Sequence, residues 1–335
     1  MLRLKISALL CGWVCLAAFA AVAGEVPEQD ITKVDADFAV QGEYVGDLTS
    51  ADGAKQKLGA HIIACGKGAF HSVFYPGGLP GEGWDGKTRI EKVPAKEGNV
   101  PVDTKTEGDK TVVDSVYKAA ISGEVITGQT DKGGKFELKK VLRKSPTLEL
   151  KPPPGALVIF DGTSLDQVAN GRMTEDKLLQ EDVYSKEKLG SGTLHVEFRS
   201  PYVPMARGQG RGNSGVYMQS RYETQILDSF GLEGLHNECG GIYSVKAPDV
   251  NMCFPPLSWQ TYDIEFTAAQ YDGGKKTKNA AVSVKHNGVQ IHKYVDVPHS
   301  TTASPKPEGP DPAPLYLQGH GNPVRFRTVW FVEKK

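Results

Sequence analysis

Short runs in which apolar and polar residues alternate recur along this 335-residue chain, and most of them are bounded by Gly, Pro, Asn or Asp. A period of two is typical of a β-strand with one buried face, whereas an amphipathic helix needs a period of about 3.6 residues. Long helical patterns are almost absent from the sequence. The chain is therefore predicted to be all-β, and its 39% hydrophobic residues are enough to form a packed core.

Three consecutive prolines, Pro152, Pro153 and Pro154, separate two blocks of predicted strands. A proline run is stiff and cannot pair in a sheet, so we expect the boundary between domains there. The first block, residues 30–150, is predicted to be a smaller β-rich domain, and its role stays open. The second block, residues 156–335, has the many short strands of a two-sheet sandwich or jelly roll.

The alternation also predicts which face each side chain occupies in the second block. In the stretch 194–199 the apolar residues face one way and His195, Glu197 and Arg199 the other. In the final strand, Phe326 and Trp330 are predicted on one face, opposite Arg325 and Arg327. In "VSVKHNGVQIH", Asn287 and Gly288 stand between two alternating runs. They predict a two-residue hairpin turn, because such a turn needs positive φ angles.

The N-terminus has the pattern of a secretory signal over residues 1–23. Arg3 and Lys5 precede an apolar run, and the small residues 21–23 form a cleavage site. A membrane anchor is the alternative interpretation of this run. We expect export to the periplasm or the extracellular space, with no membrane span after signal cleavage.

Cysteine use fits an exported protein. Cys11 and Cys15 would leave with the signal, and Cys239 and Cys253 are predicted to close a disulfide across a turn-rich segment. Cys65 is expected to be a small buried hydrophobic residue. The spacing typical of zinc ligands is absent. Because 39 Lys and Arg balance 40 Asp and Glu, nucleic acid is not an expected partner.

The segment "GNSGVYMQSRYETQILDSFG" places Glu223, Gln225 and Asp228 close together. Alternation sends Glu223 and Gln225 to the face opposite Tyr222, where a curved sheet would make them converge, as a sugar ligand requires. Asp228 would join them only if the chain bends. Each candidate also has a purely structural interpretation: Glu197 and Arg199 as a surface pair, Asn213 and Asp228 in turns, and His320 in a loop.

Seven motifs, in this order, resemble the 3-keto-disaccharide hydrolase domain family over about residues 156–335. They are "FDGTSLDQV", "LHVEFR", "GNSGVYMQSRYETQILDSFG", "CGGIYSVKAPDVN", "WQTYDIEFTA", "VKHNGV" and "LQGHGNPVRFRTVWF". In the first block, "FHSVFYPGGLPGEGWD" resembles a segment that precedes this domain in some exported members. The family usually has an acid before the histidine of the last motif, where this chain has Gly319.

The resemblance implies a concanavalin-like jelly roll that acts on glycosides whose C3 hydroxyl is oxidised to a ketone. The ketone acidifies the C2 hydrogen, so a base can remove that proton and the C1 substituent can leave before water adds. By resemblance, the catalytic candidates are Glu223, His320 and Asp228. The candidates for substrate contact are Gln225, Asn213, Glu197, Arg199, Gln219 and Arg325.

The same resemblance implies a saccharide as partner and a sugar 3-dehydrogenase that supplies the oxidised substrate. No cofactor is certain, and a divalent cation held by a carboxylate and a histidine stays an open alternative. Two other functions also stay open: a lectin-like module that binds saccharides without turnover, and a structural exoprotein.

Overall fold

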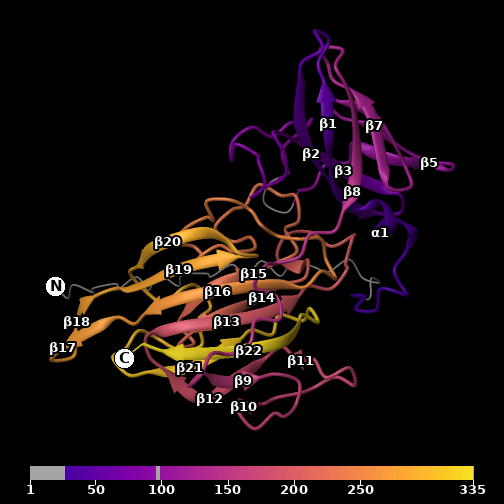
Figure 1. Ribbon diagram of the computed structural model, residues 1–335. Coiled ribbons are helices and arrows are strands. Elements are labelled where there is room, and N and C mark those ends of the chain that lie inside the picture. The colour runs from indigo at the N-terminus through magenta and orange to yellow at the C-terminus, as the bar shows by residue number, and fades with distance from the viewer. Residues whose placement is uncertain (1–26, 96–98, 335) are drawn as a thin grey trace, which may run out of the picture.

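The computed structural model describes residues 27–95 and 99–334 (Figure 1). Within these residues the chain is almost entirely β-strands and loops, with one short helix, α1 (Ala36–Val40), and one 3-10 turn, η1 (Gly208–Gly210). The prediction of an all-β fold, with a sandwich preceded by a smaller β-rich unit, is confirmed. The predicted signal at residues 1–23 lies outside the described residues. No helix in the described part is long and apolar enough to cross a membrane.

The first eight strands form a closed barrel, because β1 pairs with both β2 and β8 (Figure 1). Its interior is filled by apolar side chains, among them Tyr44, Phe70 and Phe74. Gly46 lets β1 lie close against β8, since a Cβ there would be 2.0 Å from the Glu137 carbonyl oxygen. The barrel strands are β1 (Gly42–Thr49), β2 (Lys55–Gly66), β3 (Ala69–Pro76), β4 (Thr104–Glu107), β5 (Lys110–Asp114), β6 (Lys118–Ser122), β7 (Val125–Gln129) and β8 (Lys135–Val141).

Residues 157–333 form two facing sheets. The first sheet has the order β10-β12-β21-β14-β15, and the second has β11-β22-β13-β16-β19-β20 with β9 paired to β22. The first-sheet strands are β10 (Val168–Ala169), β12 (Val183–Leu189), β21 (Ala313–Leu317), β14 (Ser214–Met218) and β15 (Tyr222–Ile226). The second-sheet strands are β9 (Leu157–Phe160), β11 (Leu179–Gln180), β13 (Gly192–Arg199), β16 (Gln260–Thr267), β19 (Ala280–His286), β20 (Val289–Val297) and β22 (Arg325–Glu333). β17 (Gln270–Asp272) and β18 (Lys275–Lys278) form a separate ribbon.

Apolar residues of both sheets meet in one core. Tyr222 of β15 packs on Phe266 of β16 with ring centroids 5.5 Å apart, and Phe198 of β13 packs on Tyr262 of β16 at 4.7 Å. The predicted hairpin is present, because Asn287 and Gly288 join β19 to β20 with φ angles of 50° and 78°. The alternation read from the sequence therefore positions most core residues correctly.

Trp330 departs from the predicted alternation. The pairing of β13 with β22 shifts by one residue between Glu197 and Phe198, so Arg327 is an extra residue in the ladder. Beyond this bulge the faces exchange, and Trp330 stacks on His195 with ring centroids 5.0 Å apart, on the outer face of the second sheet. Its indole Nε1 donates to the Leu150 carbonyl at 3.2 Å.

The barrel packs closely against the sandwich. Ile63, Val73 and Tyr75 of β2 and β3 belong to the same hydrophobic cluster as the sandwich core. Arg89 donates to the carbonyls of Leu232 at 2.7 Å and Gly231 at 2.9 Å. The two parts of the chain thus share apolar and polar contacts.

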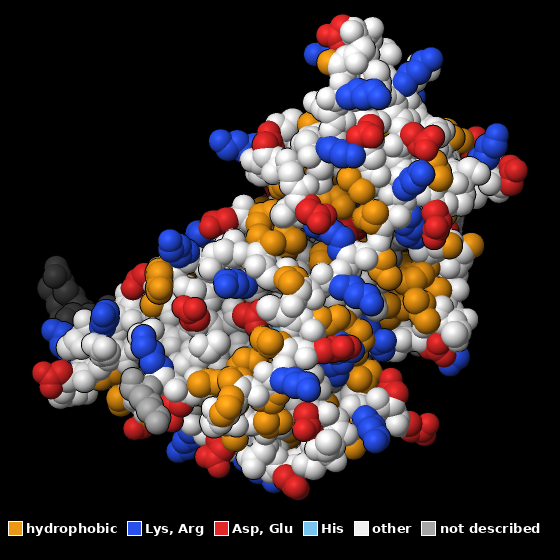
Figure 2. Space-filling view, viewed as in Figure 1, with side chains coloured by type: hydrophobic (Ala, Val, Ile, Leu, Met, Phe, Trp, Pro, Cys, Tyr) orange, Lys and Arg blue, Asp and Glu red, His pale blue; other side chains and the backbone are white. Residues whose placement is uncertain are grey.

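Charged side chains of both signs are interspersed over the face of the molecule that Figure 2 shows.

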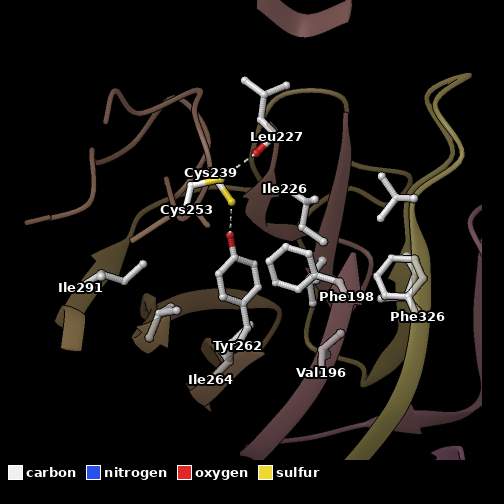
Figure 3. Close-up of a cluster of buried hydrophobic side chains, with 14 of the residues drawn as sticks. Val196, Phe198, Ile226, Leu227, Cys239, Cys253, Tyr262, Ile264, Ile291 and Phe326 are labelled. Atoms are coloured by element: carbon white, nitrogen blue, oxygen red, sulfur yellow. Dashed lines mark hydrogen bonds between the residues drawn. The ribbon is translucent and has the colours of Figure 1, made fainter. Parts of the chain in front are cut away.

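The predicted disulfide between Cys239 and Cys253 is not formed, and both residues are free thiols (Figure 3). The sulfur of Cys239 lies 3.1 Å from the Tyr262 hydroxyl, and the thiol of Cys253 donates to the Leu227 carbonyl at 3.5 Å. Both side chains are buried in the core. The turn-rich segment between them is held by hydrogen bonds instead, such as Asn251 Nδ2 to the Ser229 carbonyl at 2.8 Å. Cys65 is buried as expected.

Candidate functional site

A polar cavity of about 110 Å³ lies at the first sheet, beside its edge strand β15. Strands β14 and β15 supply the floor, and four loops supply the remaining walls. The cavity is lined by Gln209, Asn213, Tyr217, Glu223, Gln225, Tyr243, Thr302, Ala303, Gln318 and His320. Four residues that the sequence predicted as site residues are therefore brought together: Asn213, Glu223, Gln225 and His320.

Glu223 and Gln225 lie on the cavity face of β15, as the alternation predicted. Tyr222 and Ile226 belong to the hydrophobic core on the other face. The free edge of β15 is covered by the loop that follows it, since Gln225 N donates to the Gly241 carbonyl at 2.9 Å. Both polar side chains are consequently buried, with 2% and 1% exposure.

Burial raises the pKa of Glu223 from 4.5 to about 8, and a hydrogen bond with Tyr217 offsets only part of this rise. No cation pairs with the carboxyl group among the ion pairs of the described residues. The same desolvation raises the pKa of the Tyr217 and Tyr243 hydroxyls, and the charge of Glu223 raises them further. A carboxyl group with a pKa close to neutrality can exchange protons with a substrate.

Gly215 of β14 makes room for this carboxyl group. It pairs directly with Gln225, and a Cβ on Gly215 would lie 2.2 Å from Glu223 Oε1 and 3.0 Å from the Tyr217 ring. Tyr217 in turn accepts a hydrogen bond from Gln318 Nε2 at 3.2 Å. The glycine is therefore needed for Glu223 to lie flat against the strand.

Three amide side chains form a network on one wall of the cavity. Gln209 Oε1 accepts from Asn213 Nδ2 at 3.0 Å and from Gln225 Nε2 at 2.8 Å. Gln209 Nε2 donates to the Asn237 carbonyl at 2.8 Å. The amide oxygens of Asn213 and Gln225 are buried without a hydrogen-bond partner.

His320 lies at the exposed rim of the cavity. The neighbouring Gly319 has no room for an acidic side chain, because a Cβ there would be 2.7 Å from Asp182 Cβ. Asp182 accepts a hydrogen bond from the Tyr316 hydroxyl at 3.1 Å. A carboxylate from the turn before β12 thus lies beside Gly319.

Asp228 does not reach the cavity, which corrects its prediction as a catalytic residue. Alternation turns it away from Glu223, and it forms a buried ion pair with Arg211, Nε to Oδ2 at 2.7 Å. Arg211 also donates to the carbonyls of Ala64 and Pro204. Asp228 therefore compensates a buried charge at the contact between barrel and sandwich.

Glu197 and Arg199 are also corrected, because β13 lies in the second sheet. Glu197 is buried between His195 and Arg327, and it accepts from the Glu149 backbone N–H. Arg199 lies over the Trp259 ring, with the guanidinium carbon 5.2 Å from the ring centroid. The surface pair considered from the sequence is thus not exposed either, since the segment after the barrel covers it.

Arg325 and Gln219 likewise lie outside the cavity. Arg325 pairs with Glu181 at 2.8 Å. Gln219 donates to the Leu189 carbonyl at 2.9 Å and accepts from Arg221 at 3.1 Å. Each side chain bonds to a residue that is distant in the sequence, and a strand pattern does not reveal such contacts.

The sequence reasoning missed Gln209, Tyr217, Tyr243, Thr302 and Gln318. Tyr217 could have been found, because the antiparallel pairing places it opposite Glu223. Gln318 stands two residues before His320 in a motif that was already singled out. The other three lie on loops, where alternation carries no information. Within residues 27–95 and 99–334, no group of three or more His, Cys, Asp or Glu is placed to hold a metal ion.

The chain is thus a β-sandwich protein whose cavity contains a buried carboxyl group, amides and tyrosines. Such a cavity suits a polar ligand that is rich in hydroxyl groups. The domain described as "3-keto-alpha-glucoside-1,2-lyase-like" matches residues 82–332, and the chain belongs to this family. The match supports a carbohydrate-active role. It begins within the barrel, well before residue 156, so the family relationship extends beyond the sandwich.

Two solved structures from Parabacteroides distasonis, each described as a "putative glycosyl hydrolase", are similar to part of the chain. One is 28% identical with a TM-score of 0.49 and covers 53% of this chain and 84% of its own. The other is 20% identical with a TM-score of 0.39 and covers 53% of this chain and 99% of its own. None of the curated proteins matches the chain.

Proposed function

We propose that the protein cleaves glycosides oxidised to a ketone at C3, by elimination across C1 and C2 followed by addition of water. The observation that carries the proposal is the buried Glu223 carboxyl group, with its pKa near 8, in a cavity that also contains His320. The description of the family, "3-keto-alpha-glucoside-1,2-lyase-like domain", supports this choice of substrate class. The substrate would come from an oxidoreductase that converts a C3 hydroxyl group to a ketone.

In the proposed reaction Glu223 is the base. Its carboxylate removes the C2 proton, and the electron pair of the C–H bond forms the enolate of the C3 ketone. The hydroxyl of Tyr243, whose raised pKa keeps it protonated, donates to the enolate oxygen. The enolate then expels the C1 oxygen, which takes a proton from His320 at the rim, and a C1–C2 double bond remains.

Water completes the reaction. It adds to C1 of the conjugated ketone and gives a proton back to His320, while C2 regains a proton from Glu223, so the net change is hydrolysis. If the product leaves before this addition, the protein acts as a lyase. Because Glu223 must be ionised to act as the base, kcat/KM should rise with pH up to about 8.

The burial of Glu223 favours catalysis over simple saccharide binding. The Glu223 carboxyl group is buried in the cavity wall and has no cation partner, so its charged form is disfavoured. This penalty destabilises the folded state at neutral pH. An amide would form the same wall without this cost. Strained or destabilising groups of this kind are usually kept where activity needs them.

The test uses 3-keto-trehalose carrying deuterium at C2, with and without chelator. We expect release of glucose with a primary isotope effect, and loss of deuterium from the 3-keto product to the extent that Glu223 exchanges with water before C2 is reprotonated. Release of glucose with full retention of the deuterium and no isotope effect would exclude the elimination, and absence of any release would exclude the activity. The Glu223→Gln variant is the matched control, since it keeps the shape of the wall and removes the base.

A further inference from the structure

We propose that Asn213 and Gln225 accept hydrogen bonds from two hydroxyl groups of one sugar ring, and that Gln209 is the positioning residue that orients both amides for this task. The inference rests on the proposed function, because it identifies the part of the same cavity that recognises the sugar. It begins from the amide network and from the two buried oxygens without a partner.

Backbone carbonyls fix the orientation of all three amides. A carbonyl can only accept, so the group that Gln209 directs to the Asn237 carbonyl must be its NH₂, which leaves Gln209 Oε1 as an acceptor. Asn213 Nδ2 donates to the Gln209 carbonyl at 2.9 Å. Gln225 Nε2 lies 3.4 Å from the Asn237 carbonyl. Rotating any of these amides would bring an oxygen against another oxygen.

As a consequence, the free polar atoms of the Asn213 and Gln225 side chains are Oδ1 and Oε1, and both can only accept hydrogen bonds. The protein supplies a donor to neither of them. A buried acceptor without a partner is unfavourable, and the cost is recovered when a donor arrives. Both residues line the cavity, so a group that enters it is the natural donor.

Two unpaired acceptors on side chains that share one hydrogen-bond partner select a ligand with two donors. The pairing of β14 with β15 places Gln225 opposite Gly215, two residues after Asn213, and both side chains meet at Gln209. Hydroxyl groups on adjacent ring carbons are the donors that a pyranose presents together. The expected ligand is therefore a sugar with at least two free hydroxyl groups on the ring held in this cavity.

The experiment is an NMR titration of the isotope-labelled full chain with glucose and with its monodeoxy analogues. In the wild-type protein, removal of either recognised hydroxyl group should weaken binding about tenfold, because one buried oxygen then loses its donor. Gln209→Met removes the acceptor that orients the amides, so these penalties should shrink to about twofold. Gln209→Glu keeps the acceptor but sets a second oxygen against the Asn237 carbonyl, so it should restore only part of the discrimination.

Gln219→Met is the control, because Gln219 is a buried glutamine that lies outside the cavity. It should leave the binding pattern of the wild-type protein unchanged, and thermal unfolding shows whether each variant is folded. Equal binding of all deoxy analogues by the wild-type protein would overturn the inference. So would unchanged discrimination in Gln209→Met, or binding of Ca²⁺ that displaces glucose from the cavity.

The binding experiment separates this inference from the proposed reaction. Discrimination among deoxy sugars without cleavage of 3-keto-trehalose would support the inference and exclude the proposed activity. Cleavage of 3-keto-trehalose together with uniform binding of the deoxy sugars would support the activity and exclude the inference.

Discussion

Glu223 illustrates how one buried carboxyl group links stability to function. The folded protein holds its proton up to about pH 8, whereas its ordinary pKa is 4.5. The contribution of this group to the free energy of unfolding is therefore complete below pH 4.5, and it is lost as the pH rises through 8.

The Glu223→Gln variant should consequently be more stable than the wild-type protein at neutral pH, by about 2–4 kcal/mol, because the amide cannot ionise. It should lose activity on 3-keto glycosides by about 100-fold or more, the usual contribution of a positioned base. Urea unfolding at pH 5 and pH 8 checks the first expectation. An equal pH dependence of stability in both proteins would contradict the raised pKa.

Gly215→Ala tests whether space for the carboxyl group matters. The added methyl group would overlap Glu223 Oε1, so activity should fall at least tenfold although no polar group is removed. Gly190→Ala is the control, since its Cβ would meet only the end of the Glu333 side chain, at 3.0 Å. Steady-state rates of the two variants give the comparison, and equal activity would show that Glu223 can move without consequence.

At the scale of elements, alternation predicted the strand faces but not what covers them. Leu194, Val196 and Phe198 point into the core as expected. Glu197 was considered as part of a surface pair, yet the segment after the barrel lies across this face of the sheet, with Thr147 donating to Asp263 at 2.8 Å. A contact between residues more than 100 positions apart leaves no local signature in the sequence.

His195 lies between Asp263 and Glu197, the two carboxylates that bind this covering segment. Burial lowers its pKa, but hydrogen bonds to Asp263 and Glu197 outweigh burial and raise the pKa above 6.5. Arg327 and Glu149 are the other charged groups of the cluster. The stabilisation from His195 is therefore complete below pH 6.5 and is lost as the pH rises through the raised pKa.

We expect His195→Leu to destabilise the protein by about 3 kcal/mol, because two buried carboxylates lose the histidine between them. The loss should be largest at acidic pH, and the activity of the folded variant should stay unchanged because the cavity belongs to the other sheet. Urea unfolding from pH 5 to pH 9 measures this, with His299→Leu at an exposed position as the control. A loss that grows toward alkaline pH would contradict the assignment.

At the scale of the whole molecule, the proline run suggested two separate units, but the barrel contributes to two hydrophobic clusters, its own interior and the sandwich core. Ile63, Val73 and Tyr75 of the barrel are packed into the sandwich core. Strand patterns identify an apolar face without saying which partner covers it. For the same reason the loops that complete the cavity could not be placed, although Glu223 and Gln225 of β15 were predicted.

The fragment 156–335 should therefore be unstable without the barrel, because part of its core would be exposed to water. We expect it to bind a hydrophobic dye and to lack a cooperative melting transition, whereas the full chain should unfold in one transition. Calorimetry of the two proteins makes the comparison. A fragment that melts cooperatively near the temperature of the full chain would show that the barrel is dispensable for folding.

Tyr262 of the second sheet donates its hydroxyl to the Gln225 carbonyl at 2.6 Å, across the core. This bond ties the backbone of the cavity floor to the opposite layer, so β15 cannot move outward to admit a larger ligand without breaking it. Related proteins that accept different glycosides should then differ in the loops around residues 209, 243 and 302, while the anchored strand stays the same.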